Sequence, residues 1–213
     1  MRRTSYVQIS LEETVRPAAP SDKVSRLLAS VVLARGLSPF RDQASIPAFQ
    51  ARMALVSRCF PEYQWPEMRE DEIYERVAQL CSGKRSLEEL APLSLIDSFM
   101  EQLTDPQRIL LRREAPERIQ LKSGRPIKVH YSPANPPWIE SRLQDFFGTY
   151  STPRICAGQV PLTIHLLAPN GRAVQVTQDL AGFWERHYSA VRRELRRRYP
   201  KHAWPEPGTL KKD

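Results

Sequence analysis

The chain has 213 residues, of which 41% are apolar and 26% charged, an ordinary composition for a folded protein with one substantial core or two small ones. This excludes wholesale disorder. The longest nearly apolar run, Leu27 to Ala34, is far shorter than the roughly 20 residues that cross a bilayer, so we expect no membrane partner. Arg2 and Arg3 are followed by Glu12 and Glu13 before any apolar segment, which argues against a signal peptide and for a cytoplasmic protein.

Positive charge is concentrated in the C-terminal part of the chain. Residues 118–213 contain 16 Lys and Arg against 7 Asp and Glu, a net of +9, whereas residues 1–117 contain 16 against 17, a net of −1. Each phosphate contact made by a cation releases a condensed counterion, so a concentrated basic region favours binding to a polyanion. We therefore expect RNA or another nucleic acid as the partner of this region.

The three cysteines, Cys59, Cys81 and Cys156, are an odd number without CxxC or Cys/His spacing. This pattern fits neither a disulfide framework nor a zinc site, and it is typical of a reducing compartment. We therefore expect plain thiols and no bound metal.

Helical spacing of apolar residues dominates residues 23–115. The first helix follows a cap at Ser21 or Asp22, and a later one has Asp105 as its expected N-cap with Pro106 in the first position. We predict an N-terminal extension at 1–22 and a helical lobe at 23–115, with helices at 23–35, 47–60, 70–81, 86–90, 93–103 and 106–113.

Near Ala115 the pattern changes to the polar and apolar alternation of strands. Residues 117–121 and 126–131 flank a turn and predict a β-hairpin. Residues 160–167 and 172–176 predict a second one, because the Asn170-Gly171 step between them is a strong hairpin signal.

Two further helices are expected in this part of the chain. One covers 138–147, where apolar residues recur at helical spacing before Gly148. The final one has Thr177 as its expected cap and Asp179 in its first turn, and it ends at Pro200. From Pro205 onward we expect frayed chain. The sequence thus predicts an α+β fold, with a helical N-terminal lobe, a basic domain at 116–208 that holds two β-hairpins and a long C-terminal helix, and a flexible tail at 209–213.

The final helix is strongly amphipathic. Its apolar residues recur at steps of three and four: Trp184, Tyr188, Val191, Leu195 and Tyr199. The candidate nucleic-acid contacts lie on its other face or close to its end: Arg186, Arg192, Arg193, Arg196, Arg197, Arg198 and Lys201. A solvated cationic face and contact with an acidic protein surface are the alternatives, but the excess of arginine favours bidentate phosphate recognition.

Aromatic residues near this helix could provide a stacking platform for bases. The candidates are Trp138, Trp184, Tyr199 and Trp204, although their amphipathic setting and flanking prolines favour a role as core anchors. Lys122, Arg125 and Lys128 of the first hairpin could extend the basic surface.

No catalytic centre is visible in the sequence. There is no phosphate loop, HExxH, GxSxG or glycine-rich dinucleotide turn, and the four histidines are scattered. Asp145 and Asp179 are the only carboxylates of the basic domain that a metal-dependent hydrolase could use, and they are far apart in sequence. Whether the chain is an enzyme is therefore left open.

Several ordered strings of residues resemble the C-terminal region of the HrpB family of bacterial DEAH-type ATP-dependent RNA helicases. The resemblance covers about Leu27 to Gly208 and is dense after Ala115. Its densest strings are 143–148 (LQDFFG), 152–155 (TPRI), 158–162 (GQVPL), 165–170 (HLLAPN), 174–184 (VQVTQDLAGFW) and 198–205 (RYPKHAWP). Two positions depart from the family pattern, with His130 where an acid is expected and Arg197 where a glycine is expected.

The resemblance implies an accessory segment that follows a helicase motor, its winged-helix part and its OB-like part. The motor's phosphate loop and DEAH tetrad do not occur in this chain. We therefore expect no cofactor here, since ATP and magnesium belong to the family's motor, and we expect the chain to bind RNA beside a motor in cis or in trans. The alternative is a protein docking module whose proline- and tryptophan-rich end clasps a partner without nucleic-acid contact.

Overall fold

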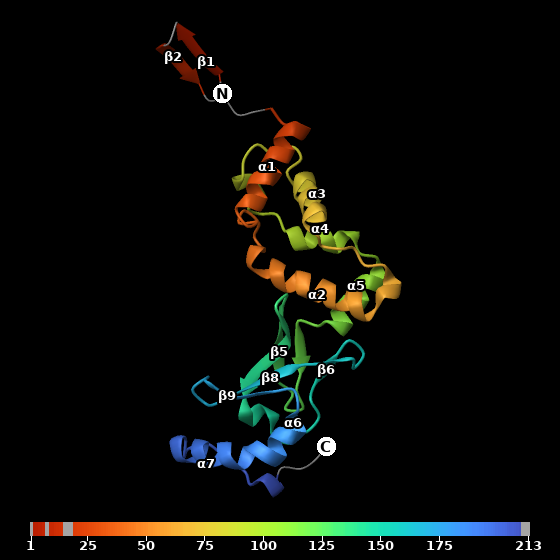
Figure 1. Cartoon of the computed structure of the whole chain (residues 1–213), viewed down its shortest axis with the longest axis vertical. Helices are drawn as coiled ribbons and strands as arrows, with labels where there is room; N and C mark the ends of the chain where they lie inside the picture. Colours follow the sequence, from red (N-terminus) through yellow and green to blue (C-terminus); the bar gives the residue numbers. More distant parts are fainter. Residues whose placement is uncertain (1, 7–8, 15–18, 210–213) are drawn as a thin grey trace. The chain divides into compact units, whose positions relative to one another are not determined.

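A computed structural model describes residues 2–6, 9–14 and 19–209 (Figure 1). The chain forms two compact units. The first takes the residues up to Ile46 together with Glu67–Gln102, and the second takes Pro47–Pro66 and the chain from Leu103 onward. The predicted boundary at 115/116 falls inside the second unit, and the division into lobes at 23–115 and 116–208 stays a prediction. The predicted flexible tail at 209–213 lies, apart from Thr209, outside the described residues.

The first unit contains an antiparallel hairpin and a helical cluster. The hairpin, β1 (Arg2–Tyr6) and β2 (Ile9–Thr14), falls in the segment predicted only as an extension. The helices are α1 (Asp22–Ala34), η1 (Gln43–Ser45), α3 (Glu70–Leu80), η3 (Glu88–Leu90) and α4 (Leu95–Gln102). Ser21 caps α1 by accepting a hydrogen bond from the Val24 N–H at 3.3 Å, as predicted.

A single carboxylate fixes the start of α4. Asp42 accepts hydrogen bonds from the backbone N–H groups of Leu95 and Ile96, at 3.2 and 2.8 Å, and from the Ser94 hydroxyl at 2.6 Å. These bonds satisfy donors that a helix start otherwise leaves unpaired.

The second unit begins with the helices α2 (Ile46–Cys59), η2 (Pro61–Tyr63) and α5 (Asp105–Glu114). The predicted cap of α5 was one residue too late, because Thr104 is the N-cap and forms a capping box with Gln107. Arg52 of α2 is buried and donates to the Ala115 carbonyl at 2.9 Å and to Glu117 at 2.7 Å, which joins α2 to the start of the sheet.

The centre of the second unit is a mixed five-stranded sheet. Its strand order is β3 (Arg118–Gln120), β4 (Pro126–Ser132), β5 (Asn135–Arg142), β8 (Thr163–Leu167) and β9 (Ala173–Thr177). Only β5 and β8 are parallel. Both predicted hairpins are present, as β3–β4 and β8–β9, although residues 160–161 of the predicted second hairpin pair with Arg154–Ile155 instead. One face of the sheet is buried and apolar and carries Ile127, Val129, Ile139, Ile164 and Leu166.

The predicted helix at 138–147 was wrong. Residues up to Arg142 belong to β5, and only η4 (Leu143–Phe146) is a short 3₁₀ turn. Burial alternates strictly from Pro137 to Arg142, because β5 lies between two partner strands, and its pairing outweighs the local helical spacing. A separate pair, β6 (Arg154–Ile155) and β7 (Val160–Pro161), completes the strands.

The C-terminal helical segment is continuous but irregular. It consists of α6 (Leu180–Gly182), a π-helical stretch η5 (Phe183–His187) and α7 (Tyr188–Arg198), followed by the turn η6 (Pro207–Thr209). The α+β class and the long C-terminal helix are thus as predicted. No helix in the described part of the chain has the length and apolar character needed to span a membrane.

Candidate nucleic-acid interface

The start of the C-terminal helical segment is fixed by one carboxylate. Asp179, predicted for the first turn, is the N-cap in place of the predicted Thr177. It accepts hydrogen bonds from the Gly182 N–H at 2.8 Å and from the Arg186 guanidinium at 2.7 Å. These bonds lower the pKa of Asp179. A Cβ atom at residue 182 would overlap the ends of both side chains, so this ion pair lies over the first turn in space that glycine leaves open.

The inner face of the segment is held by an aromatic cluster. Trp184 and Tyr188 are buried, pack edge to face with ring centroids 5.0 Å apart, and contact Phe147 and Phe183. The Trp184 Nε1–H donates to the Thr149 carbonyl at 2.7 Å, and burial raises the pKa of Tyr188 to about 12. Leu195 continues the buried stripe, as predicted, so the helix has a fixed rotation about its own axis.

Three arginines of α7 project away from this stripe. At about 100° per residue, Arg193 and Arg197 each lie roughly 160° from Leu195, and Arg196 lies roughly 100° from it, on the flank next to Arg193. All three are exposed, and none has an acidic partner within the described ranges. Lys201, just beyond the helix, is also exposed. We call Arg193, Arg196 and Arg197 the outer arginine face.

The other predicted contacts are engaged within the protein. Arg186 pairs with Asp179, and Arg198 lies 4.0 Å from Glu194. Arg192 donates to the Trp204 carbonyl at 2.9 Å and pairs with Glu206, and its side chain is only 13% exposed. The structure thus separates the seven predicted cations into an outward group and a group with internal partners.

The segment after the helix is packed rather than frayed, contrary to the prediction. The Tyr188 hydroxyl donates to the Pro205 carbonyl at 2.9 Å, and the Trp204 Nε1–H donates to the Tyr199 carbonyl at 3.0 Å. The Trp204 ring is 7% exposed. Trp184 and Trp204 are therefore core anchors, and the Trp204 ring is used internally rather than presented to a partner.

The remaining candidates of the basic domain lie in separate local structures. Arg125 of the first hairpin pairs with Asp145 at 3.1 Å, and Asp145 also accepts from Ser141. Asp179 is occupied as a helix cap, so the two carboxylates considered for metal chemistry are used in two different contacts. Within residues 19–209 no group of three or more His, Cys, Asp or Glu side chains could hold a metal ion.

Comparisons with known proteins agree with the resemblance. Residues 77–207 match the HrpB C-terminal family, described as ATP-dependent helicase C-terminal. The ATP-dependent RNA helicase HrpB of Escherichia coli strain K12 is 30% identical over 211 residues, covering 96% of this chain and 26% of that protein.

Solved structures give the same result. A crystal structure of the E. coli DExH-box NTPase HrpB matches with a TM-score of 0.77 at 28% identity, and one of the E. coli DEAH/RHA helicase HrpB with 0.69 at 27%. Each match covers 95% of this chain and 26% of the other. The fold and the matches thus define the chain as a helicase-associated α+β domain. It belongs to the HrpB C-terminal family, and it spans about a quarter of the length of these relatives.

Proposed function

We propose that this chain binds the phosphate backbone of RNA through the outer arginine face, as an accessory domain that works with an HrpB-like helicase motor in cis or in trans. The observation that carries the proposal is the position of Arg193, Arg196 and Arg197, which are exposed on α7 without acidic partners in the described chain. Arg193 and Arg197 lie opposite the buried Leu195, and Arg196 lies on the adjoining flank.

The electrostatics of this face favour a polyanion over simple solvation. Arg193 lies three residues from Arg196 and four from Arg197, and like charges at these spacings destabilise a helix by a few tenths of a kcal/mol per pair. The same spacing places guanidinium groups about one helical turn apart, where each can donate two hydrogen bonds to one phosphate. A bound phosphodiester backbone would relieve the repulsion and gain from counterion release.

The salt dependence of RNA binding tests this proposal. We expect the full chain to bind a single-stranded RNA of about twelve nucleotides in a filter-binding titration, with affinity that falls steeply between about 50 and about 200 mM salt. Binding that does not change with salt, or the absence of binding at the lower concentration, would refute it.

The sequence motifs by which the helicase motor binds ATP and magnesium do not occur in this chain. We propose that this chain alone does not bind ATP or magnesium, because it contains neither a phosphate loop nor a DEAH tetrad. Calorimetric titration with magnesium-ATP should give no saturable heat.

We also propose a cytoplasmic location, because the matched relatives are bacterial helicases that act on RNA.

The alternative, a protein docking module, would need a surface that does not include Trp204, because this side chain is buried and donates a hydrogen bond to the Tyr199 carbonyl. A partner that stays bound after nuclease treatment in a pull-down would support it.

A further inference from the structure

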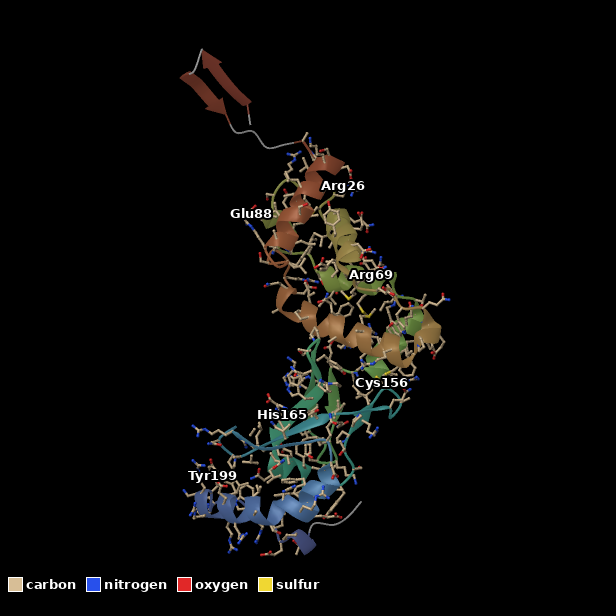
Figure 2. All side chains as sticks on the ribbon, viewed as in Figure 1. Arg26, Arg69, Glu88, Cys156, His165 and Tyr199 are labelled. Atoms are coloured by element: carbon tan, nitrogen blue, oxygen red, sulfur yellow. The ribbon has the colours of Figure 1, made fainter. Side chains whose placement is uncertain are left out.

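The face of the sheet opposite the buried one carries three flat rings. His130 on β4, Trp138 on β5 and His165 on β8 lie on this outer face, because His130 pairs with Trp138 in the ladder and the flanking residues of each strand are buried. The rings stack on one another in a row, with Trp138 between the two histidines and with nearly parallel planes. His130 and Trp138 are 13° apart in orientation with centroids at 5.1 Å, and Trp138 and His165 are 22° apart with centroids at 6.3 Å. Figure 2 labels His165 on the sheet.

A groove opens beside the central ring. It has a volume of about 270 Å³ and is lined by Asn135, Pro136, Trp138, Thr163 and His165. All of its residues come from β5 and β8, and its position follows from the parallel pairing of Trp138 with Thr163. Trp138 is the one tryptophan of the four that is not buried, since Trp65, Trp184 and Trp204 are 8%, 3% and 7% exposed.

The charge around these rings is positive. Arg118 and Lys128 pair directly across β3 and β4 on this face, and Arg142 lies at the end of β5. All three are exposed. The opposing carboxylate on the same face is Glu140, whose Oε1 lies 3.8 Å from the His130 Nε2. Burial lowers the pKa of His130 despite Glu140, so at neutral pH its ring is an uncharged stacking surface.

We propose that this outer face is a stacking platform for the bases of single-stranded nucleic acid, with Trp138 as the central ring and Arg118, Lys128 and Arg142 beside it for the phosphates. The proposal rests on the proposed function, because it names the part of the nucleic acid that a second surface of the same unit recognises. It adds base contacts, which the outer arginine face does not supply.

The aromatic rings and cations of the outer face fit a nucleobase and its phosphate. A nucleobase is a flat, uncharged ring that is linked through a ribose to a phosphate, so it fits aromatic rings with cations nearby. The face offers a row of three stacked rings across adjacent strands, an open groove beside the central ring, and three exposed cations against one carboxylate. Stacking on aromatic rings tolerates any base, so little sequence preference is expected.

The experiment compares RNA with a backbone that lacks bases. Binding of labelled RNA of about twelve uridines, and of an abasic strand of the same length, is measured by fluorescence anisotropy for the full chain, for Trp138→Leu and for Trp138→Phe. We expect Trp138→Leu to weaken RNA binding by about 5- to 150-fold and to leave abasic binding unchanged, while Trp138→Phe retains most of the affinity. Tyr63→Leu, which removes a partly exposed ring elsewhere in the same unit, is the matched control and should have no effect.

Intrinsic fluorescence gives a second measurement that does not require the leucine variant to fold. RNA should quench the tryptophan emission of the unmodified chain, the abasic strand should not, and Trp138→Phe should abolish the quenching. Equal RNA affinity of Trp138→Leu and the unmodified chain, or quenching that survives in Trp138→Phe, would overturn the platform and leave the outer arginine face intact.

The two proposals can fail separately. If alanine at Arg193, Arg196 and Arg197 leaves RNA binding unchanged while Trp138→Leu weakens it, the platform stands and the outer arginine face does not. If the unmodified chain binds no RNA, both are refuted together.

Discussion

Removal of the outer arginine face should reduce the salt dependence of RNA binding by a predictable amount. The variant is Arg193→Ala with Arg196→Ala and Arg197→Ala, which lowers the formal net charge from +8 to +5 without touching the buried stripe. Each contact to a single strand contributes about 0.7 to the slope of log affinity against log salt, so losing three contacts should reduce the slope by about 2.

This change of slope is large enough to measure. Over a fourfold rise in salt, from about 50 to about 200 mM, three such contacts account for a loss of affinity of roughly 20-fold. The variant should therefore bind more weakly than the unmodified chain at low salt, and the difference should shrink as salt rises. Filter binding at several ionic strengths gives both slopes.

A matched variant separates local contact from net charge. Lys23→Ala with Arg35→Ala and Arg85→Ala also lowers the net charge from +8 to +5, but all three residues are exposed positions of the first unit. We expect its slope to equal that of the unmodified chain. Equal slopes for the α7 variant and the unmodified chain, or equal losses in the two variants, would refute the reasoning.

Three further predictions concern stability and reactivity. Leu195→Ala should destabilise the fold by about 2 to 5 kcal/mol, because Leu195 is 3% exposed, and an unchanged urea midpoint would contradict its place in the core. The folded pKa of Asp179 is lowered, so its stabilisation is present at neutral pH and is lost as the pH falls through that pKa. The melting temperature of Asp179→Ala should therefore fall less steeply with acidification than that of the unmodified chain, and parallel curves would argue against the cap. Burial raises the pKa of Cys156 to about 12 and also raises that of Cys81, so a thiol reagent at mildly alkaline pH should modify half-buried Cys59 first and the other two only on unfolding. Simultaneous reaction of all three would count against this.

The elements predicted correctly are those whose signals lie close together in sequence. The Ser21 cap defines the start of α1, and the Asn170-Gly171 step defines the β8–β9 turn, where Gly171 has a positive φ of 82°. Each signal acts over a few residues, so its physical cause is visible without knowledge of the partners. The α+β class follows from such local signals together with the change of period near Ala115.

The errors arise where distant segments decide the structure. β5 is a strand because β4 and β8 pair with it on both sides, and the β8 residues lie more than 20 positions away along the chain. The polar residue Ser141 points inward on β5 and obscured its alternation. Trp138 was predicted as a stacking candidate, but its place between His130 and His165 was missed for the same reason, since the ring would not lie there on a helix.

The candidate interface was predicted in outline but not in detail. The sequence indicates an amphipathic cationic helix, but it does not show that Glu206 in the tail returns to pair with Arg192. This return depends on the packing of Trp204 and on the hydrogen bond from Tyr188 to the Pro205 carbonyl, which are tertiary contacts. The separation of the cations into outward and internally paired groups therefore required the structure.

The most direct test of the central proposal is an NMR titration of the arginine Nε–Hε groups with a single-stranded RNA of uridines. We expect the resonances of Arg193, Arg196 and Arg197 to shift together and saturate, while those of Arg26 and Arg69 in the first unit stay in place. Saturable shifts at Arg26 and Arg69 without shifts on α7, or no shift on α7 under conditions where RNA is bound, would contradict it.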